Sequence, residues 1–308
     1  MLSIIMPVYN GEKYLEETLN SILSQQFKNY ELLIYNDAST DKTQKILEYY
    51  KKKDERITLY RGSKNILQPN AMNFLINKTK NEYIALHDAD DVSMPNKFFL
   101  QMNYLIKNSD IGLLGTFAEI IDEKSNIIRK ISYPCKHDKI KKEIANNNCF
   151  AQSSVIFKKK IYRKVGKFNA LFNPAQDYDM WTRMINLTKV ENLPEYLLRY
   201  REHEQSSSRI NKANSIIKSL FISQNYKYLK KGKDILKKNR LLSIDESSLL
   251  KFFKLSKLKI EFEMKFAELA ASYKKKNLVK FLYNFYKLFK LNNKLLSLKI
   301  IHYIQKSL

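Results

Sequence analysis

Apolar runs and helical repeats alternate along the first 90 residues of the chain. Short apolar runs predict strands at 3–8, 30–35, 57–60 and 83–86. Apolar residues spaced three and four apart predict the intervening helices, at 12–26, 41–50 and 70–80. Strands that alternate with helices indicate an α/β fold with a mainly parallel sheet and right-handed crossovers. In such a sheet, ligands bind beyond the carboxyl ends of the strands, where the strand order reverses.

The pattern is less regular after residue 95. We expect one helix over 98–106 and another over 178–185, with strands at 111–115 and 153–157. Residues 125–148 are polar and irregular, which is typical of an insertion between regular elements.

Three carboxylates follow the fourth predicted strand within four residues. Asp88 and Asp90 are two positions apart in an extended segment, so they should point to the same side, with Asp91 on the other. Like charges this close repel each other, and a cation or strong hydrogen-bond donors must offset the repulsion. Oxygen ligands without a nearby cysteine favour Mg²⁺ or Mn²⁺ over Zn²⁺. The stretch therefore predicts a divalent cation site.

A simpler interpretation assigns these residues to the start of a helix. Asp91 or Ser93 would cap that helix, and Pro95 would lie in its first turn. This interpretation explains Asp91 and Pro95 but leaves Asp88 and Asp90 unexplained, so we favour the cation site.

Two further polar clusters lie at the carboxyl ends of predicted strands. Tyr9 and Asn10 follow the first strand, and Asn36 and Asp37 follow the second. Because parallel strands end at one edge of a sheet, both clusters should meet the carboxylates at 88–90 in one crevice.

Composition limits the size and location of the protein. The chain has 308 residues and is 44% hydrophobic, enough for one large domain or two smaller ones. Cys135 and Cys149 are isolated, which favours a reducing compartment. No apolar run reaches the ~18–20 residues of a membrane-spanning helix. The first residues lack a basic segment and are soon broken by Pro7, unlike a signal peptide. We expect a cytoplasmic protein.

The positive charge is concentrated near the carboxyl end. Residues 205–308 hold 24 Lys and Arg against 6 Asp and Glu, so +18 of the formal +24 lies there. This asymmetry fits an anionic partner, but it also fits lysines on solvated faces. Apolar residues from 278 to 289 share one helical face with lysines outside it. That helix could pack on the rest of the protein or lie on an anionic membrane.

Four motifs stand out between residues 6 and 181. They are Met6-Pro7-Val8-Tyr9-Asn10, Asn36-Asp37-Ala38-Ser39-Thr40-Asp41, Asp88-Ala89-Asp90-Asp91 with Pro95, and Gln176-Asp177-Tyr178-Asp179-Met180-Trp181. In this order and spacing, residues 1–207 resemble the family 2 inverting glycosyltransferases of the GT-A fold. The resemblance implies a catalytic domain over 1–207, followed by a helical basic region over 208–308.

The resemblance also implies substrates and a cofactor. The donor would be a nucleotide-sugar, a UDP-sugar, and the cofactor would be Mn²⁺ or Mg²⁺. The acceptor would be a glycan or a lipid-linked molecule in the synthesis of cell-surface polysaccharide or lipooligosaccharide. The insertion at 125–148 would lie on the acceptor side, and the enzyme could attach peripherally to the inner face of the membrane.

Individual residues take roles from the matched motifs. Asp90 would bind the metal, Asp88 would lie near the ribose, and Asp177 would be the catalytic base. His203, within Tyr200-Arg201-Glu202-His203-Glu204-Gln205-Ser206, would approach the metal and the diphosphate, although a lone histidine is more often structural. The donor-binding positions would be Pro7, Val8, Tyr9, Asn10, Glu12, Asp37, Asn70, Asp88 and Ala89. Among them, Pro7, Tyr9 and Asp37 would hold the base and ribose.

The sequence departs from the family pattern in three places. The family often has two acidic residues where this chain has Asn36-Asp37, and Asn-x-Gly where the segment 65–71 has no glycine. Both departures leave the detailed donor contacts open. Gln176 replaces the usual glutamate before the base, which keeps the base but changes its neighbour.

The implied chemistry suits these residue types. Sugar transfer from a nucleoside diphosphate passes through an oxocarbenium-like transition state, as glycoside hydrolysis does. A divalent cation offsets the charge of the leaving diphosphate, and a carboxylate takes the proton of the attacking hydroxyl. One base opposite the leaving group gives inversion without a covalent intermediate.

Two other functions compete with sugar transfer. Nucleotidyl transfer also pairs carboxylates with a metal, but the chain has no glycine-rich phosphate loop with a lysine. Nucleic-acid binding rests on charge alone and lacks a recognised motif, so we expect no nucleic-acid partner. The sequence does not identify the sugar, the linkage, the acceptor or the oligomeric state.

Overall fold

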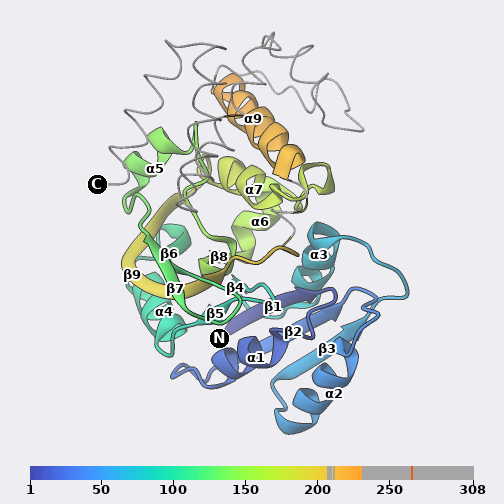
Figure 1. The fold of residues 1–308 in the computed structure, drawn as a ribbon. Coiled ribbons are helices and arrows are strands. Elements are labelled where there is room, and N and C mark those ends of the chain that lie inside the picture. The colour runs from blue at the N-terminus through green and yellow to red at the C-terminus, as the bar shows by residue number, and fades with distance from the viewer. Residues whose placement is uncertain (207–209, 211, 231–264, 266–308) are drawn as a thin grey trace.

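A nine-stranded mixed sheet forms the centre of the protein, which we describe from a computed structural model covering residues 1–206, 210, 212–230 and 265 (Figure 1). The strand order is β3-β2-β1-β4-β8-β6-β9-β5, with β7 paired to β6. The strands are β1 (Leu2–Val8), β2 (Tyr30–Asn36), β3 (Ile57–Arg61), β4 (Tyr83–Leu86), β5 (Val92–Ser93), β6 (Ile111–Ile121), β7 (Ile127–Ile131), β8 (Ile156–Lys158) and β9 (Lys189–Arg201).

Helices cover both faces of this sheet (Figure 1). The α-helices are α1 (Leu15–Leu23), α2 (Thr43–Lys53), α3 (Gln68–Lys78), α4 (Lys97–Lys107), α5 (His137–Glu143), α6 (Lys159–Val165), α7 (Gln176–Met184) and α9 (Lys212–Leu229). Two short 3₁₀ helices, η1 (Gln152–Ser154) and η2 (Ala170–Phe172), lie in the connections.

The first four strands form the parallel part that the sequence predicts. β1 pairs in parallel with β2 and with β4, and β2 pairs in parallel with β3. β8 then runs antiparallel to both β4 and β6, which makes the sheet mixed. The α/β class with a mainly parallel sheet is confirmed.

The unbroken apolar runs of the central strands reflect burial on both faces. Ile5 points into a core that also contains Leu75 of α3 and Trp181 of α7. Its neighbour Ile4 points into a second core with Leu19 of α1 and residues of α2 and α4. A strand buried on both faces reads as continuously apolar, as β1 does.

Several elements differ from their predicted bounds. β6 continues to Ile121 because it pairs with β9 along most of its length. The polar segment 125–148 contains the edge strand β7 and the helix α5. Ser153 and Ser154 belong to η1 instead of a strand, and the Ser154 hydroxyl donates to the Ala151 carbonyl at 2.7 Å.

The proposed helix start after the carboxylates is wrong. α4 begins at Lys97 after Asn96, and no side chain caps it. Asp91 accepts the backbone N–H of Arg201 instead, at 2.9 Å. Asp91 is therefore tied to β9, which β8 and β6 separate from β4 in the sheet.

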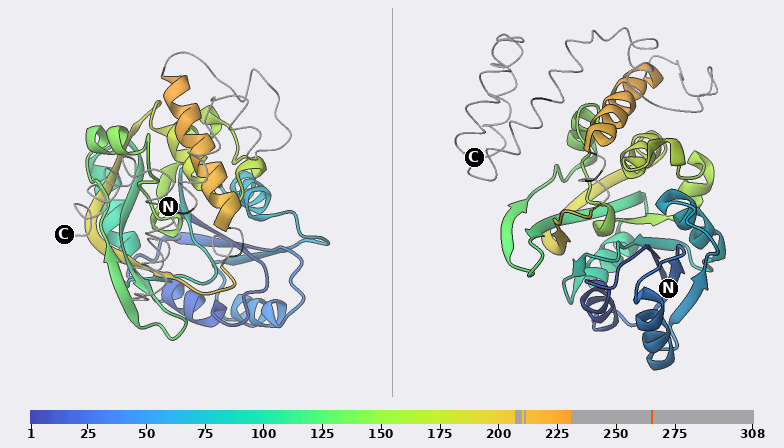
Figure 2. Two further views of the ribbon diagram at one scale, coloured as in Figure 1. Left: turned by 45° about the horizontal axis from the view of Figure 1, so that its top comes forward. Right: turned by 45° about the vertical axis from the view of Figure 1, so that its right-hand side comes forward.

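The helix α9 packs on α7 (Figure 2). Phe221 of α9 lies against Phe172, with ring centroids 6.1 Å apart. The Ser223 hydroxyl donates to the Ala145 carbonyl at 2.7 Å. Residues 212–229 thus share a core with α7, although the sequence assigned them to the C-terminal region. The amphipathic segment at 278–289 lies outside the described residues, and no helix within the described part is long and apolar enough to cross a membrane.

Candidate active site

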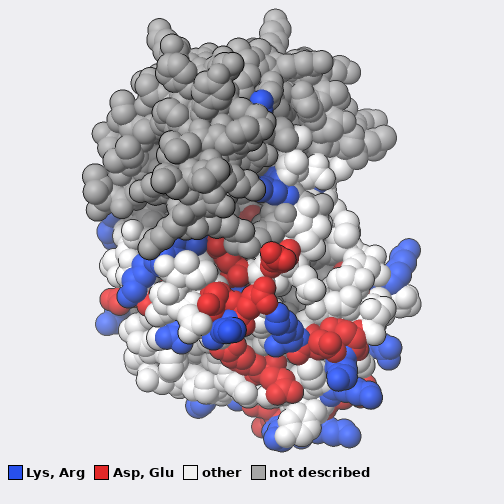
Figure 3. Space-filling view, viewed as in Figure 1, with Lys and Arg blue, Asp and Glu red and all other residues white. Residues whose placement is uncertain are grey.

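A cavity of about 690 Å³ opens at the carboxyl ends of β1 and β4. The polar clusters that follow β1, β2 and β4 meet there, as expected for the open edge of a parallel sheet. The surface of the protein is not uniformly basic, because Asp and Glu side chains concentrate across the middle of one face (Figure 3).

Most of the predicted site residues line this cavity. They are Pro7, Val8, Tyr9, Asn10, Asp37, Asp88, Ala89, Asp90, Asp177 and His203. Glu12 and Asn70 are not among the lining residues. The Glu12 carboxylate accepts the Lys42 backbone N–H at 2.8 Å, and the Asn70 amide donates to the Ile66 carbonyl at 2.7 Å. Both side chains fasten loops beside the cavity, so the structure does not support a direct donor contact for either.

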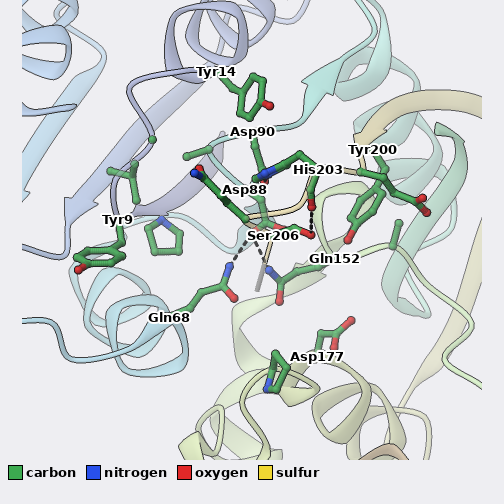
Figure 4. A pocket seen from close by; sticks show the side chains of 18 of the residues that line it. Tyr9, Tyr14, Gln68, Asp88, Asp90, Gln152, Asp177, Tyr200, His203 and Ser206 are labelled. Atoms are coloured by element: carbon green, nitrogen blue, oxygen red, sulfur yellow. Dashed lines mark hydrogen bonds and ion pairs between the residues drawn. The ribbon is translucent and has the colours of Figure 1, made fainter. Parts of the chain in front are cut away.

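The three carboxylates after β4 divide between two sides. Asp88 and Asp90 face the cavity (Figure 4). Asp91 is only 1% exposed and is not among the lining residues. The predicted division is found, although β4 ends at Leu86 and a turn at Ala89 and Asp90, instead of an extended segment, produces it.

The Asp88 carboxylate is held by two amides. Its Oδ1 accepts hydrogen bonds from Gln68 Nε2 and Gln152 Nε2, each at 2.7 Å (Figure 4). Burial and then the charge of Asp90 raise the pKa of Asp88 to about 7, although the Gln152 hydrogen bond opposes this. Neither glutamine belongs to a motif, and only their position in the folded chain identifies them.

A buried arginine fixes the loop that carries Asp90. Arg201, 1% exposed, donates from Nε to the Asp90 carbonyl at 2.8 Å. It also reaches the Asp122 carbonyl at 3.0 Å and the Glu17 carboxylate at 2.6 Å. The loop is therefore anchored to α1 and to the β6–β7 hairpin. The Asp90 carboxylate itself lies 2.8 Å from Nε2 of His203.

The oxygen and nitrogen donors suit a divalent cation completed by substrate. Across the described ranges, no group of three or more His, Cys, Asp and Glu side chains could hold a metal alone. Mg²⁺ is commonly bound through one or two carboxylates together with substrate phosphates and water. Asp90, with His203 beside it, fits that kind of site better than a metal cage built from protein alone.

Asp177 approaches the cavity from the side opposite Asp88 and Asp90 (Figure 4). It lies in the first turn of α7, and its Oδ2 accepts a hydrogen bond from Asn148 Nδ2 at 2.7 Å. Burial raises the pKa of Asp177 to about 6, and hydrogen bonds from the Tyr178 backbone and from Asn148 oppose the increase. Asp177 is therefore mainly ionised at pH 7 but can accept a proton easily.

Asp179, two residues further along, is structural. It is buried and pairs with Arg183 at 2.7 Å. The Arg183 guanidinium also donates to the carbonyls of Val165 and Lys167, at 2.8 and 3.0 Å. This pair joins α7 to the segment after α6, away from the cavity.

A buried lysine that sequence reasoning missed lies beneath the carboxylates. Lys97 has no exposed surface, and its Nζ donates to the Ser153 carbonyl and to the Ser93 hydroxyl. Burial lowers the pKa of Lys97 to about 7, while the charges of Asp91 and Asp88 oppose this. A lysine in the first turn of a helix gives no signal of this placement in the sequence.

Sequence comparison places the chain near known glycosyltransferases. Residues 3–166 match the family described as glycosyl transferase family 2. The Escherichia coli O-antigen biosynthesis glycosyltransferase WbnJ is 35% identical over 213 residues, which cover 68% of this chain and 82% of the relative. An uncharacterized glycosyltransferase of Methanocaldococcus jannaschii, MJ1057, is 34% identical over 218 residues, covering 69% of this chain and 75% of the relative.

Solved structures share the fold at low sequence identity. S. aureus TarS 1-349 in complex with UDP-GlcNAc aligns with a TM-score of 0.61 at 15% identity, covering 87% of this chain and 80% of that one. The Pyrobaculum calidifontis mannosyltransferase PcManGT, in complex with GDP-Man and Mn²⁺, aligns with a TM-score of 0.60 at 16% identity, covering 99% and 85%. The fold is of the GT-A type.

The elevated pKa of Asp177 can be measured directly. Carboxyl ¹³C shifts followed against pH, with the signal assigned through Asp177→Asn, should give a value near 6. Asn148→Ala removes a hydrogen bond that favours the charged form, so the pKa of Asp177 should rise further. Asn126→Ala removes a similar contact to Asp122 on the exposed hairpin and should leave Asp177 unchanged. A wild-type pKa near 4 would contradict the burial argument.

Proposed function

The chain belongs to glycosyl transferase family 2, and we propose that this enzyme moves a sugar from a UDP-sugar to a hydroxyl of a glycan or lipid-linked acceptor, with inversion. It is a nucleotide-sugar-dependent glycosyltransferase of the EC 2.4 class. One observation carries the proposal. A single cavity has Asp88 and Asp90 on one side and Asp177 on the other, which separates a site for the leaving diphosphate from a site for the base.

The donor would bind along the ends of β1 and β2. Tyr9 is 52% exposed at the cavity, where its ring can stack on a base. Asp37 lies in the same wall, and its Oδ1 holds the Ile66 backbone N–H at 2.7 Å. Pro7 and Asp88 complete the pocket proposed for base and ribose. The complex of TarS with UDP-GlcNAc supports a UDP-sugar as the donor. Because PcManGT binds GDP-Man, GDP is the nucleotide against which the affinity for UDP should be compared.

The diphosphate would lie next to Asp90. A Mn²⁺ or Mg²⁺ ion bound by Asp90, with His203 as a further ligand, would offset the charge of the leaving diphosphate. Without such a cation, the carboxylates of Asp88 and Asp90 would repel the donor. Arg201 keeps Asp90 in place through the backbone carbonyl.

Asp177 would act as the general base. Its pKa of about 6 lies close enough to neutrality for proton transfer while leaving the carboxylate ionised. The acceptor hydroxyl would enter from this side, lose its proton to Asp177, and attack the anomeric carbon opposite the diphosphate. Direct displacement inverts the configuration.

The basic C-terminal region would locate the enzyme at the inner face of the cell membrane. We assign residues 1–207 to the catalytic domain and 208–308 to this region, and α9, which packs on α7, would be the link between them. A cytoplasmic enzyme held there would meet lipid-linked acceptors. O-antigen biosynthesis, named for the E. coli relative, supports a role in cell-surface polysaccharide or lipooligosaccharide synthesis.

Donor binding should depend on a divalent cation. In calorimetry, UDP should bind more tightly with Mn²⁺ than with a chelator, because the cation offsets the charges of Asp88 and Asp90. Asp90→Asn should lose most of this gain, and Asp110→Asn, an exposed carboxylate paired with Lys189, should keep it. Equal UDP affinity with and without Mn²⁺ would remove the metal from the proposal. Tighter binding of GDP than UDP would reassign the donor.

Asp177→Asn should separate turnover from binding. It should keep UDP affinity and lose sugar transfer by at least ~100-fold, the usual scale for acid–base catalysis. Asp110→Asn serves again as the control. Asp179→Asn is unsuitable, because losing the Arg183 pair would destabilise α7. Transfer at near the wild-type rate would exclude Asp177 as the base.

Vesicle sedimentation tests the membrane proposal. Each Lys near an anionic surface contributes ~1 kcal/mol, so about eight such contacts, or fewer with apolar burial, give micromolar association at ~8 kcal/mol. Full-length protein should pellet with anionic vesicles, less with neutral ones and less again at high salt. A chain ending at Lys230 keeps α9 on its core and should stay in solution. Full-length protein that ignores anionic vesicles at low salt would end the proposal.

A further inference from the structure

The Asp88 carboxylate and three glutamine side chains form a closed ring of hydrogen bonds in the cavity. Gln176 Nε2 donates to Gln68 Oε1 at 2.9 Å and to Gln152 Oε1 at 3.2 Å. Gln68 Nε2 and Gln152 Nε2 both donate to Asp88 Oδ1 at 2.7 Å. The ring joins the end of β4 to α3, η1 and the first residue of α7.

The chemistry of the side chains fixes which atom donates and which accepts at each hydrogen bond of the ring. We call this the direction of the ring. Both glutamine amides meet the same Asp88 oxygen, Oδ1, which accepts two hydrogen bonds, and an amide NH₂ only donates. With Asp88 at one end, Gln68 and Gln152 must turn their NH₂ groups toward it and their carbonyl oxygens away. The residue that meets those two oxygens must then offer two N–H groups, which Gln176 does and a glutamate cannot.

The environment makes this direction costly to change. Gln176 is 3% exposed and Gln152 is 9% exposed. Gln176 Oε1 is buried without a hydrogen-bond partner among the described residues, so both links of its amide run through the NH₂ group. In a buried network, one reversed link leaves oxygen facing oxygen, and the low local dielectric enlarges the penalty.

We propose that Gln176 is a positioning residue that sets the direction of this ring. Its amide orients Gln68 and Gln152 so that both donate to Asp88 and keep Asp88 an accepting carboxylate toward the donor. The same ring ties Asp88 to the first turn of α7, which carries Asp177. The consequence for donor binding rests on the function proposed above, whereas the direction of the ring does not.

The family commonly has a glutamate at this position. If Gln176 sets the direction of the ring, restoring that glutamate should destabilise this protein. Gln176→Glu places a carboxylate against the carbonyl oxygens of Gln68 and Gln152. The two amides must then turn around, which points their oxygens at Asp88. Adding Asp88→Asn removes that conflict, because the introduced amide can donate two N–H groups to the turned glutamines. The whole ring then runs in the opposite direction, with the introduced glutamate as its accepting end.

Unfolding of the full-length chain tests the direction. Gln176→Glu should lower the thermal midpoint by on the order of 5 °C. In a protein that already carries Asp88→Asn, the same change should lower the midpoint, relative to Asp88→Asn alone, by less than half as much. Gln176→Glu combined with Asp90→Asn is the matched control, since it removes a neighbouring charge outside the ring and should not rescue stability. An equal loss in all three backgrounds, or rescue by both substitutions, would overturn the proposal.

Nucleotide affinity separates positioning from stability. With Mn²⁺, Gln176→Glu should weaken UDP binding by at least ~10-fold, and Gln176→Met, which loses the donors without adding charge, should weaken it less. Asp88→Asn with Gln176→Glu should regain stability but not affinity, because the carboxylate itself is lost. UDP binding by Gln176→Glu as tight as wild type would contradict the positioning role. If wild-type protein binds no nucleoside diphosphate, the proposed function fails, while the unfolding series still decides the direction of the ring.

Discussion

The crowding of three carboxylates at the end of β4, with Asp91 buried and Asp88 and Asp90 partly buried, is the constraint on which the site depends. Charges taken out of water are costly unless hydrogen bonds and opposite charges replace the solvent. Asp88 receives two glutamine amides, and Asp91 receives a backbone N–H from β9. The buried Lys97 side chain lies near both, and their charges oppose the lowering of its pKa by burial. Each partner comes from a different element, so the site forms only when the sheet and its helices have assembled.

The same constraint explains how the cavity divides its chemistry. Asp88 and Asp90 repel an anionic donor unless a cation lies between, which suits a metal that arrives with the diphosphate. Asp177 stands apart from them on α7, where burial raises the pKa of its carboxyl to about 6. Two groups of carboxylates in one cavity thus have different surroundings, which suits the different roles proposed for them.

The C-terminal region contributes a helix to the core and most of the net charge to the chain. Phe221 and its neighbours on α9 complete the core that also holds Trp181, so this helix supports the wall that carries Asp177. The described N-terminal part carries only a minor share of the net charge, since +18 of +24 belongs to residues 205–308. The proposed catalysis and the proposed attachment to an anionic surface would therefore depend on different parts of the chain.

The sequence by itself determined whatever depends on local order. Periodicity predicted the first four strands and their helices, and the short spacing of the carboxylates predicted that Asp88 and Asp90 share a side, which a turn after β4 brings about. Only the tertiary structure decided which distant side chains meet. It brought Gln152 to Asp88, Asn148 to Asp177 and Arg201 to the Asp90 carbonyl, and it turned Glu12 and Asn70 to loop backbone. Spacing along the chain cannot encode these contacts, because they depend on how separate elements pack and on which buried polar groups then need partners.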